Sequence, residues 1–287
     1  MKESFFNPKT PDENQLYGNI RDNIKAIAHK NRINDLWQKY KPYAHKGFKK
    51  KAQKEFIQLW WEMFLTIGIK EIGCNIEPIK SNAGPDIKIQ MDNYRIWIEA
   101  VVPQTGEGKD KVHTMEFNKF PDYPSDQLVL RLSSVINEKK NKFEKYINKG
   151  IVKTEDLCII AVCTCGLNKF ASLDQYLPLR VLSGLGNQTI NLNTGERYYL
   201  PKDHTLKQSG TEIDSNLFNQ QKFEIISAIL YSDQEILDTP PIASKTFRFY
   251  INPKCNKSFP SIFIDNIETW KKIKKSKNTV EWIKIIA

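Results

Sequence analysis

The sequence predicts an α/β protein in which a central mixed β-sheet is flanked by helices. Three patterns lead to this prediction: a hairpin pattern at 84–103, helical apolar patterns on both sides of it, and a continuous apolar run at 157–165. The apolar run is typical of a central strand that is buried on both faces. We expect strands near 72–79, 85–91, 94–102 and 157–165, and helices near 51–69 and 127–147.

The hairpin pattern consists of two runs rich in Ile, Tyr and Trp that flank the dipeptide Asp-Asn at 92–93. Asp and Asn tolerate the positive φ angles of a two-residue turn, so Met91 should face Tyr94. Side chains alternate along a strand, so this register gathers apolar side chains on one face. The same register places Asp86 directly opposite Glu99 on the other face. The apolar set is Ile87, Ile89, Met91, Tyr94, Ile96, Ile98 and Ala100.

Two facing carboxylates on paired strands repel each other. The Asp86–Glu99 pair therefore needs a shared proton, a basic neighbour or a divalent cation. Mg²⁺ is the alternative with a chemical purpose, because proteins usually hold it by one or two carboxylates together with substrate phosphates. The other alternative is an exposed hairpin face on which water solvates both charges. The pattern of the hairpin alone leaves these alternatives open.

The composition favours a folded protein with a polyanionic partner. A hydrophobic content of 40% excludes wholesale disorder, and the formal net charge is +10. This charge favours nucleic acid first and an anionic membrane surface second. No apolar run approaches about 18 residues, so no membrane span is expected. The N-terminus lacks the apolar segment of a secretory signal, and 5 loosely spaced cysteines do not indicate a disulfide framework. We expect a cytoplasmic protein and leave export without a cleaved signal open.

The chain is expected to divide into three segments. Residues 1–48 form an N-terminal helical segment, and its first helix should start within Thr-Pro-Asp-Glu at 10–13, which offers an N-cap, a Pro at the first position and a Glu two residues further on. Residues 49–166 form the core, and residues 167–287 form an α+β extension packed on it. We expect the basic tail to end in a helix whose tryptophans pack on the core, with contacts to a phosphate backbone as the alternative.

Glu62 lies within Trp-Trp-Glu-Met-Phe, in the most strongly apolar of the helical patterns. A buried carboxylate is costly unless it has a partner. Glu62 should therefore either extend to the surface or turn toward Asp86 and Glu99.

The order of these features resembles the PD-(D/E)XK nuclease superfamily, which has the restriction-endonuclease-like fold. The resemblance rests on a helix Glu, a strand, Pro-Asp, and a second strand that ends in Glu, and it covers about residues 50–165. The sequence Glu-Ala-Val, followed by Pro and a Gly-rich loop, also resembles a bacterial branch. The resemblance implies a restriction-endonuclease-like core in which Asp86 and Glu99 bind Mg²⁺ (or Mn²⁺), with Glu62 as a third acid.

One position departs from the family pattern. Family members usually carry a lysine two residues after the second acid, and here that position is Val101. In some branches the lysine lies on the following helix, which assigns the catalytic role to Lys139, with Lys140 as an alternative. The apolar stripe of the helix at 127–147 passes through position 139 or 140, which favours a buried lysine there. The alternative is that Lys139 and Lys140 lie at the edge of the stripe and extend their charged ends to the surface. Lys88, on the hairpin face of Glu99, is a further alternative.

By resemblance, the predicted function is that of a metal-dependent nuclease that hydrolyses phosphodiester bonds, with DNA as the favoured substrate. Arg131 and the loop residues Lys109 and Lys111 are the expected nucleic-acid contacts. The alternative, which Val101 favours, is a catalytically inactive nuclease-like domain that binds nucleic acid or a protein partner. The choice between DNA and RNA and assembly as a homodimer stay open.

Overall fold

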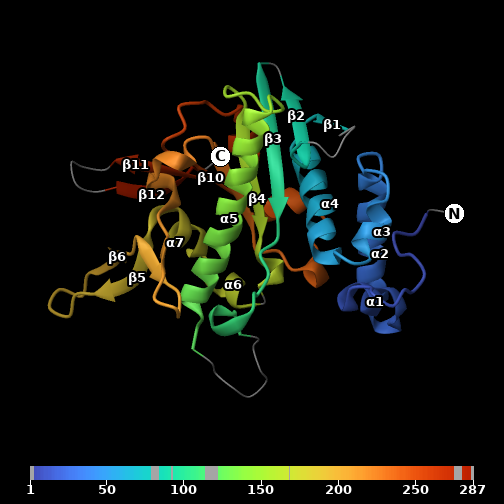
Figure 1. Ribbon diagram of the computed structural model, residues 1–287, viewed down its shortest axis with the longest axis horizontal. Coiled ribbons are helices and arrows are strands. Elements are labelled where there is room, and N and C mark those ends of the chain that lie inside the picture. The colour runs from blue at the N-terminus through green and yellow to red at the C-terminus, as the bar shows by residue number, and fades with distance from the viewer. Residues whose placement is uncertain are drawn as a thin grey trace.

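The computed structural model describes residues 3–78, 84–91, 93–113, 122–167, 169–274 and 280–285. Within these residues, one mixed sheet of eight strands runs through the molecule (Figure 1). Pairing is parallel between β3 and β4, β4 and β9, and β10 and β11, and antiparallel elsewhere. The sheet order is β1 (Ile76–Glu77), β2 (Ile87–Met91), β3 (Tyr94–Val101), β4 (Leu157–Cys163), β9 (Ala228–Ser232), β10 (Arg248–Ile251), β11 (Glu268–Lys274) and β12 (Val280–Ile285).

Helices cover both faces of the sheet, which makes the protein α/β as the sequence predicts. Two buried apolar clusters separate the layers, one on each face. The first face is covered by α1 (Gln15–Asp22), α2 (Ile27–Tyr40), α3 (Phe48–Ala52), α4 (Phe56–Glu71) and α8 (Ser261–Asn266). The second face is covered by α5 (Ser125–Asn148), α6 (Phe170–Leu173) and α7 (Leu177–Ser183).

Two small hairpins lie outside the large sheet. One consists of β5 (Leu185–Ile190) and β6 (Arg197–Pro201), and the other of β7 (His204–Leu206) and β8 (Glu212–Asp214). In Figure 1 the first hairpin projects away from the body of the molecule. The segment after residue 166 thus contributes these hairpins as well as β9 to β12 of the large sheet.

The β2–β3 hairpin has the predicted register. Met91 pairs with Tyr94, and the ladder continues to Ile87 opposite Ile98. The alternation of faces is confirmed as well: Ile98 packs in the cluster beneath α4, whereas Trp97 packs in the cluster beneath α5. Asp92, the first residue of the expected turn, lies outside the described residues.

The predicted starts of two helices are wrong. α1 begins at Gln15, because the Asn14 side chain accepts the backbone N–H groups of the first turn, whereas Glu13 is engaged by Arg21 at 2.6 Å. The helix expected over 51–69 is broken in two. At the break, the side chain of Gln53 donates to the carbonyl oxygen of Pro8 at 2.7 Å, which fixes the N-terminal arm against α3.

The strand expected near 72–79 and the helix expected in the tail also differ from the structure. Only Ile76–Glu77 of the strand expected near 72–79 pairs with β2, because α4 continues to Glu71 and the chain then turns at Gly73, whose φ is 94°. The tail forms β11 and β12 instead of a helix. The Trp270 ring stacks on Tyr250 of β10 at 6.1 Å, so the tail extends the sheet rather than covering it.

The remaining main elements agree with the sequence prediction. The helix near 127–147 is α5, and the apolar run forms β4, in which every residue is buried. No helix within the described parts of the chain is long and apolar enough to cross a membrane.

Candidate active site

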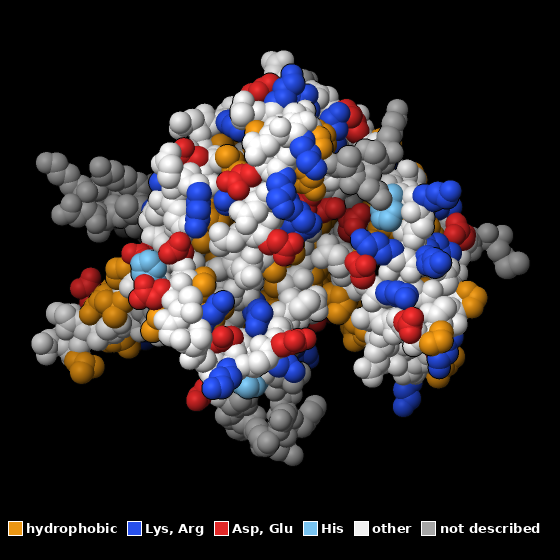
Figure 2. Space-filling model, viewed as in Figure 1, with side chains coloured by type: hydrophobic (Ala, Val, Ile, Leu, Met, Phe, Trp, Pro, Cys, Tyr) orange, Lys and Arg blue, Asp and Glu red, His pale blue; other side chains and the backbone are white. Residues whose placement is uncertain are grey.

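Four carboxylates line one pocket of about 400 Å³, and three of them are Glu62, Asp86 and Glu99; the fourth, Glu77 on β1, pairs with Lys88. Glu62 lies on α4, Glu99 on β3, and Asp86 directly before β2. We call this hollow the acid pocket. Figure 2 shows acidic side chains gathered between α5 and the N-terminal helices, with basic side chains beside them. Glu99 is only 1% exposed and lies at the inner end of the pocket, whereas Glu62 and Asp86 are half-buried.

Asp86 is fixed against the end of β3. Its Oδ2 accepts a hydrogen bond from the backbone N–H of Ala100 at 2.7 Å. This contact continues the β2–β3 pairing by one step and sets Asp86 beside Glu99, as the hairpin register predicts. Burial raises the pKa of Asp86 to about 7, and repulsion from Glu99 and Glu62 adds to the effect.

Both oxygens of Glu99 accept hydrogen bonds from α5. Lys139 Nζ donates to Oε2 at 2.7 Å, and the Tyr146 hydroxyl donates to Oε1 at 2.9 Å. Lys142 Nζ lies 3.9 Å from the same Oε2. Lys139, Lys142 and Tyr146 are three, four and seven residues apart, so they share one face of the helix.

The buried Lys139 ammonium provides the positive charge that the facing carboxylates need. Lys139 is 7% exposed. Burial alone lowers the pKa of this lysine, but the charges of Glu99 and Asp86 outweigh burial and hold it above its ordinary value. Of the three forms of compensation that the sequence leaves open, the structure therefore contains a basic neighbour.

Glu62 is held by a residue of the N-terminal segment. The hydroxyl of Tyr40 on α2 donates to Glu62 Oε1 at 3.0 Å. Burial raises the pKa of Glu62, while Tyr40 and the nearby charge of Lys51 oppose that shift. The structure thus turns Glu62 toward Asp86 and Glu99, which is one of the two alternatives given by the sequence.

The two alternative lysines do not reach the acids. Lys88 Nζ pairs with Glu77 at 2.6 Å, and Lys140 Nζ pairs with Glu144 at 2.9 Å. Val101 is 8% exposed and packs in the apolar cluster beneath α5. The side chain of Val101 therefore belongs to the core, and the ammonium of Lys139 reaches Glu99 from α5.

The expected nucleic-acid contacts lie away from the acid pocket. Arg131 packs against Gly106, where an added Cβ would lie 1.8 Å from the guanidinium carbon, and donates to the carbonyl oxygen of Asp110 at 3.3 Å. Lys109 and Lys111 are exposed in the same loop. Arg131 borders a separate pocket of about 660 Å³ that several carboxylates line: Glu107, Asp110, Glu138, Glu212 and Asp214.

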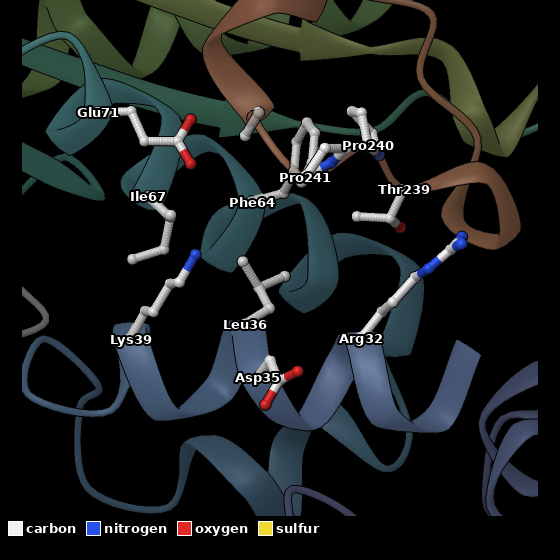
Figure 3. A pocket seen from close by; sticks show the side chains of 11 residues that line it. Arg32, Asp35, Leu36, Lys39, Phe64, Ile67, Glu71, Thr239, Pro240 and Pro241 are labelled. Carbon is white, nitrogen blue, oxygen red and sulfur yellow. The ribbon is translucent and has the colours of Figure 1, made fainter. Parts of the chain in front are cut away.

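A further hollow of about 450 Å³ lies between α2, α4 and the segment 239–243 (Figure 3). Its floor is apolar, with Phe64 and Ile67 from α4, and Arg32 and Lys39 stand at its rim. Glu71 on its border accepts a hydrogen bond from the backbone N–H of Ser244 at 3.1 Å. None of its lining residues belongs to the acid pocket, so this hollow is separate from the carboxylates.

The donor set suits a hard cation. Carboxylate oxygens are the protein ligands that Mg²⁺ prefers, and one or two of them with water suffice. Asp86 and Glu99 meet this requirement, and an oxygen that accepts one hydrogen bond keeps a second lone pair. Within the described residues, however, no group of three His, Cys, Asp or Glu side chains could hold a metal ion. A cation would therefore be held by the Asp86–Glu99 pair and water.

Three residues that hold or approach the carboxylates of the site, Tyr40, Lys142 and Tyr146, are not predicted from the sequence. Tyr146 and Lys142 could have been found, because they share the helical face of Lys139. Tyr40 gives no such signal, since its contact with Glu62 spans 22 residues and depends on how α2 packs on α4.

Comparisons of the chain with protein family models, with curated proteins and with solved structures found no match.

Proposed function

We propose that the protein is a metal-dependent nuclease that hydrolyses phosphodiester bonds, with DNA as its favoured substrate and Mg²⁺ or Mn²⁺ as its cofactor. One observation carries the proposal: two neighbouring carboxylates, Asp86 and Glu99, line one pocket, and the buried Lys139 donates a hydrogen bond to Glu99. Paired carboxylates beside a lysine are the elements that phosphodiester hydrolysis requires, because charge must be neutralised and a water positioned.

The order of elements supports the resemblance to PD-(D/E)XK nucleases. α4 is followed by the antiparallel strands β1, β2 and β3, then by α5 and by β4, which is parallel to β3. This order matches the pattern on which the resemblance rests, with Glu62 on the first helix, Asp86 before one strand and Glu99 on the next. The resemblance of the fold and the function it implies are thus proposed together.

Asp86 and Glu99 would hold the cation. When bound, it supplies neutralisation of charge on the scissile phosphate and lowers the pKa of an attacking water. Glu62 Oε1 accepts a hydrogen bond from Tyr40, and its other oxygen is available to orient a water. In the reaction a water attacks phosphorus and gives up a proton to solvent, the bond to the leaving oxygen breaks, and that oxygen takes a proton from solvent.

Lys139 takes the role that Val101 cannot fill. Its hydrogen bond to Glu99 orients that carboxylate, and its charge beside the acids of the pocket favours the approach of an anionic phosphate. Tyr146 fixes the other oxygen of Glu99. Groups that hydrogen-bond to metal-binding carboxylates set their orientation in this way.

The test is cleavage of labelled single-stranded DNA, duplex DNA and RNA with Mg²⁺, with Mn²⁺ and with EDTA. We expect metal-dependent cleavage that EDTA abolishes, and loss of cleavage in Asp86→Asn and Glu99→Gln. Lys140→Ala is the control, because that lysine pairs with Glu144 outside the site. Absence of cleavage on every substrate would overturn the enzyme proposal; salt-dependent binding without cleavage would instead favour the inactive nucleic-acid-binding domain.

A further inference from the structure

The acid pocket has two walls from distant parts of the chain. The first wall is formed by α4, α5 and the strands that carry the carboxylates. The second, which we call the N-terminal wall, is formed by Tyr40, Tyr43 and His45 of the segment 1–48 and by Lys51 on α3. From the sequence, residues 1–48 are expected to form a separate helical segment, but the packing of α2 and α3 on α4 makes that segment part of the site.

We propose that the acid pocket accepts a single strand of nucleic acid, one nucleotide at a time, and excludes the interior of a duplex. This inference rests on the proposed nuclease function and names its substrate class. Single-stranded DNA is the substrate to which the proposal commits.

The depth and size of the pocket are the first argument. Glu99 is 1% exposed, so a phosphate that lies across the mouth of the pocket cannot reach it. A volume of about 400 Å³ falls in the range of sites for small molecules, which suits a single nucleotide. A base pair is larger than one nucleotide, so the volume suits an unpaired nucleotide rather than a paired one.

The second argument is the charge on the two walls. Lys51 lies on the N-terminal wall and Lys142 on the wall formed by α5. Their side chains are 50% and 42% exposed, so an entering strand meets both, whereas Lys139 is buried behind them. Two cations on opposite sides of the pocket can neutralise the phosphates on either side of one nucleotide.

The third argument is the aromatic content of the N-terminal wall. The rings of Tyr43 and His45 are half-buried and line the pocket. Unpaired bases stack on such rings with little dependence on sequence, while the faces of paired bases are already covered by their neighbours. Aromatic and cationic groups together are the usual elements of a site for a single strand.

The first experiment compares the cleavage of three DNA substrates by the protein in the presence of Mn²⁺. The substrates are a single strand, a blunt duplex of the same sequence, and a duplex with a single-stranded tail. We expect cleavage of the single strand and of the tail, with the paired region left intact. Cleavage of the duplex interior at the rate of the single strand would overturn this inference and leave the nuclease function standing. Absence of cleavage in all three samples would overturn the nuclease function itself. An RNA strand of the same sequence shows whether the sugar matters.

The second experiment measures binding without metal, by fluorescence anisotropy in EDTA. Tyr43→Ala should weaken single-strand binding about 10-fold, with duplex binding unchanged, and Tyr43→Phe should restore it because the ring remains. Thermal unfolding of each variant reports whether it is folded. Equal effects of Tyr43→Ala on single strands and duplexes would contradict the inference.

Lys51→Ala provides a second variant on an exposed side chain, and Lys54→Ala is its matched control. Both lysines pair with an acid, at 3.5 Å for Lys51 with Glu55 and 3.2 Å for Lys54 with Asp12, but only Lys51 lines the pocket. Single-strand affinity should fall more in Lys51→Ala than in Lys54→Ala. Equal losses would mean that only general charge attracts the strand, which overturns the proposed entry route.

Discussion

Lys139 on α5 donates a hydrogen bond of 2.7 Å to Glu99 on β3, although 40 residues separate them in the sequence. Both side chains are buried, and removing either one would leave the other as a buried charge without its partner. The bond connects the helix that covers the second face of the sheet to the strand that carries the site. It also places a lysine from a helix beside the two carboxylates of the hairpin.

Replacing Lys139 by alanine should reduce cleavage by about 100-fold or more, since a positioned charge-stabilising group is lost. Binding to DNA in EDTA should change little, because one cation among many is removed. Lys140→Ala and Lys88→Ala are the matched controls and should cleave normally. If Lys139→Ala retained full cleavage and one of the controls did not, the role would belong to the other lysine.

Asp86→Asn should separate metal binding from folding. The charge of Asp86 is opposed by burial and by two neighbouring carboxylates, so the neutral side chain should stabilise the metal-free protein by up to about 1 kcal/mol. Wild-type protein should unfold at a higher temperature when Mn²⁺ is added, because a ligand that binds only the folded state stabilises it by mass action. The variant should show no such shift in a thermal scan. An equal Mn²⁺ shift in both proteins would place the metal elsewhere.

The hairpin could be predicted from sequence because its signals are local. A period of two and a two-residue turn fix the register between Met91 and Tyr94, and the register fixes the neighbours of Asp86. The helical face of Lys139 is local as well, since the apolar stripe of α5 passes through it. These features needed no knowledge of the rest of the fold.

Other features depend on contacts that the sequence does not reveal. The tail becomes a strand because β10 offers it a parallel edge and Trp270 stacks on Tyr250, and neither contact leaves a periodic signal. The break before α4 is stabilised by Gln53 holding Pro8, 45 residues away. Tyr40 reaches Glu62 only because α2 packs against α4. Tertiary packing decides each of these cases against local propensity.

Tyr146→Phe tests the positioning of Glu99 with the loss of a single hydroxyl group. Tyr146 donates to Glu99 Oε1 at 2.9 Å, so its removal leaves that oxygen without its fixed partner. We expect metal affinity or cleavage to fall by about 10- to 100-fold, the usual range for partners of metal-binding groups. A titration of cleavage against Mn²⁺ concentration separates the two effects. Tyr40→Phe removes the hydroxyl that donates to Glu62 and should reduce metal affinity or cleavage less than Tyr146→Phe does. A larger loss in Tyr40→Phe would make Glu62 the principal metal ligand.

Asp156→Asn tests a structural carboxylate that holds the start of β4. Asp156 is 2% exposed, pairs with Arg95 at 2.7 Å, and accepts the indole N–H of Trp97 at 2.8 Å. Its hydrogen bonds outweigh burial, which by itself raises the pKa, and hold the pKa below the ordinary value. We expect the variant to lose about 2–3 kcal/mol of unfolding free energy, as for hydrogen bonds to charged groups.

The lowered pKa of Asp156 also fixes the direction of a pH effect. A carboxyl whose folded pKa lies below its unfolded value, about 3.9, contributes stability above that value and loses it as pH falls through the folded pKa. The difference in unfolding free energy between wild type and Asp156→Asn should therefore be constant near neutral pH and shrink below about pH 4. Denaturant titrations at several pH values measure it. A difference that grew as the pH fell would contradict the assignment.

The final prediction concerns the net charge of +10 and the loop that carries Lys109 and Lys111. DNA affinity in EDTA should fall steeply between about 50 mM and about 200 mM salt, because basic side chains release condensed counterions. If the exposed Lys109 and Lys111 contact phosphates, replacing each by alanine should reduce the salt slope by about one. Arg131→Ala should leave the slope unchanged, since Arg131 is held against Gly106 among several carboxylates. Anisotropy titrations measure each slope. A flat salt dependence in the wild-type protein would mean that its positive charge is not a nucleic-acid-binding surface, and the alternative of a protein partner would then be favoured.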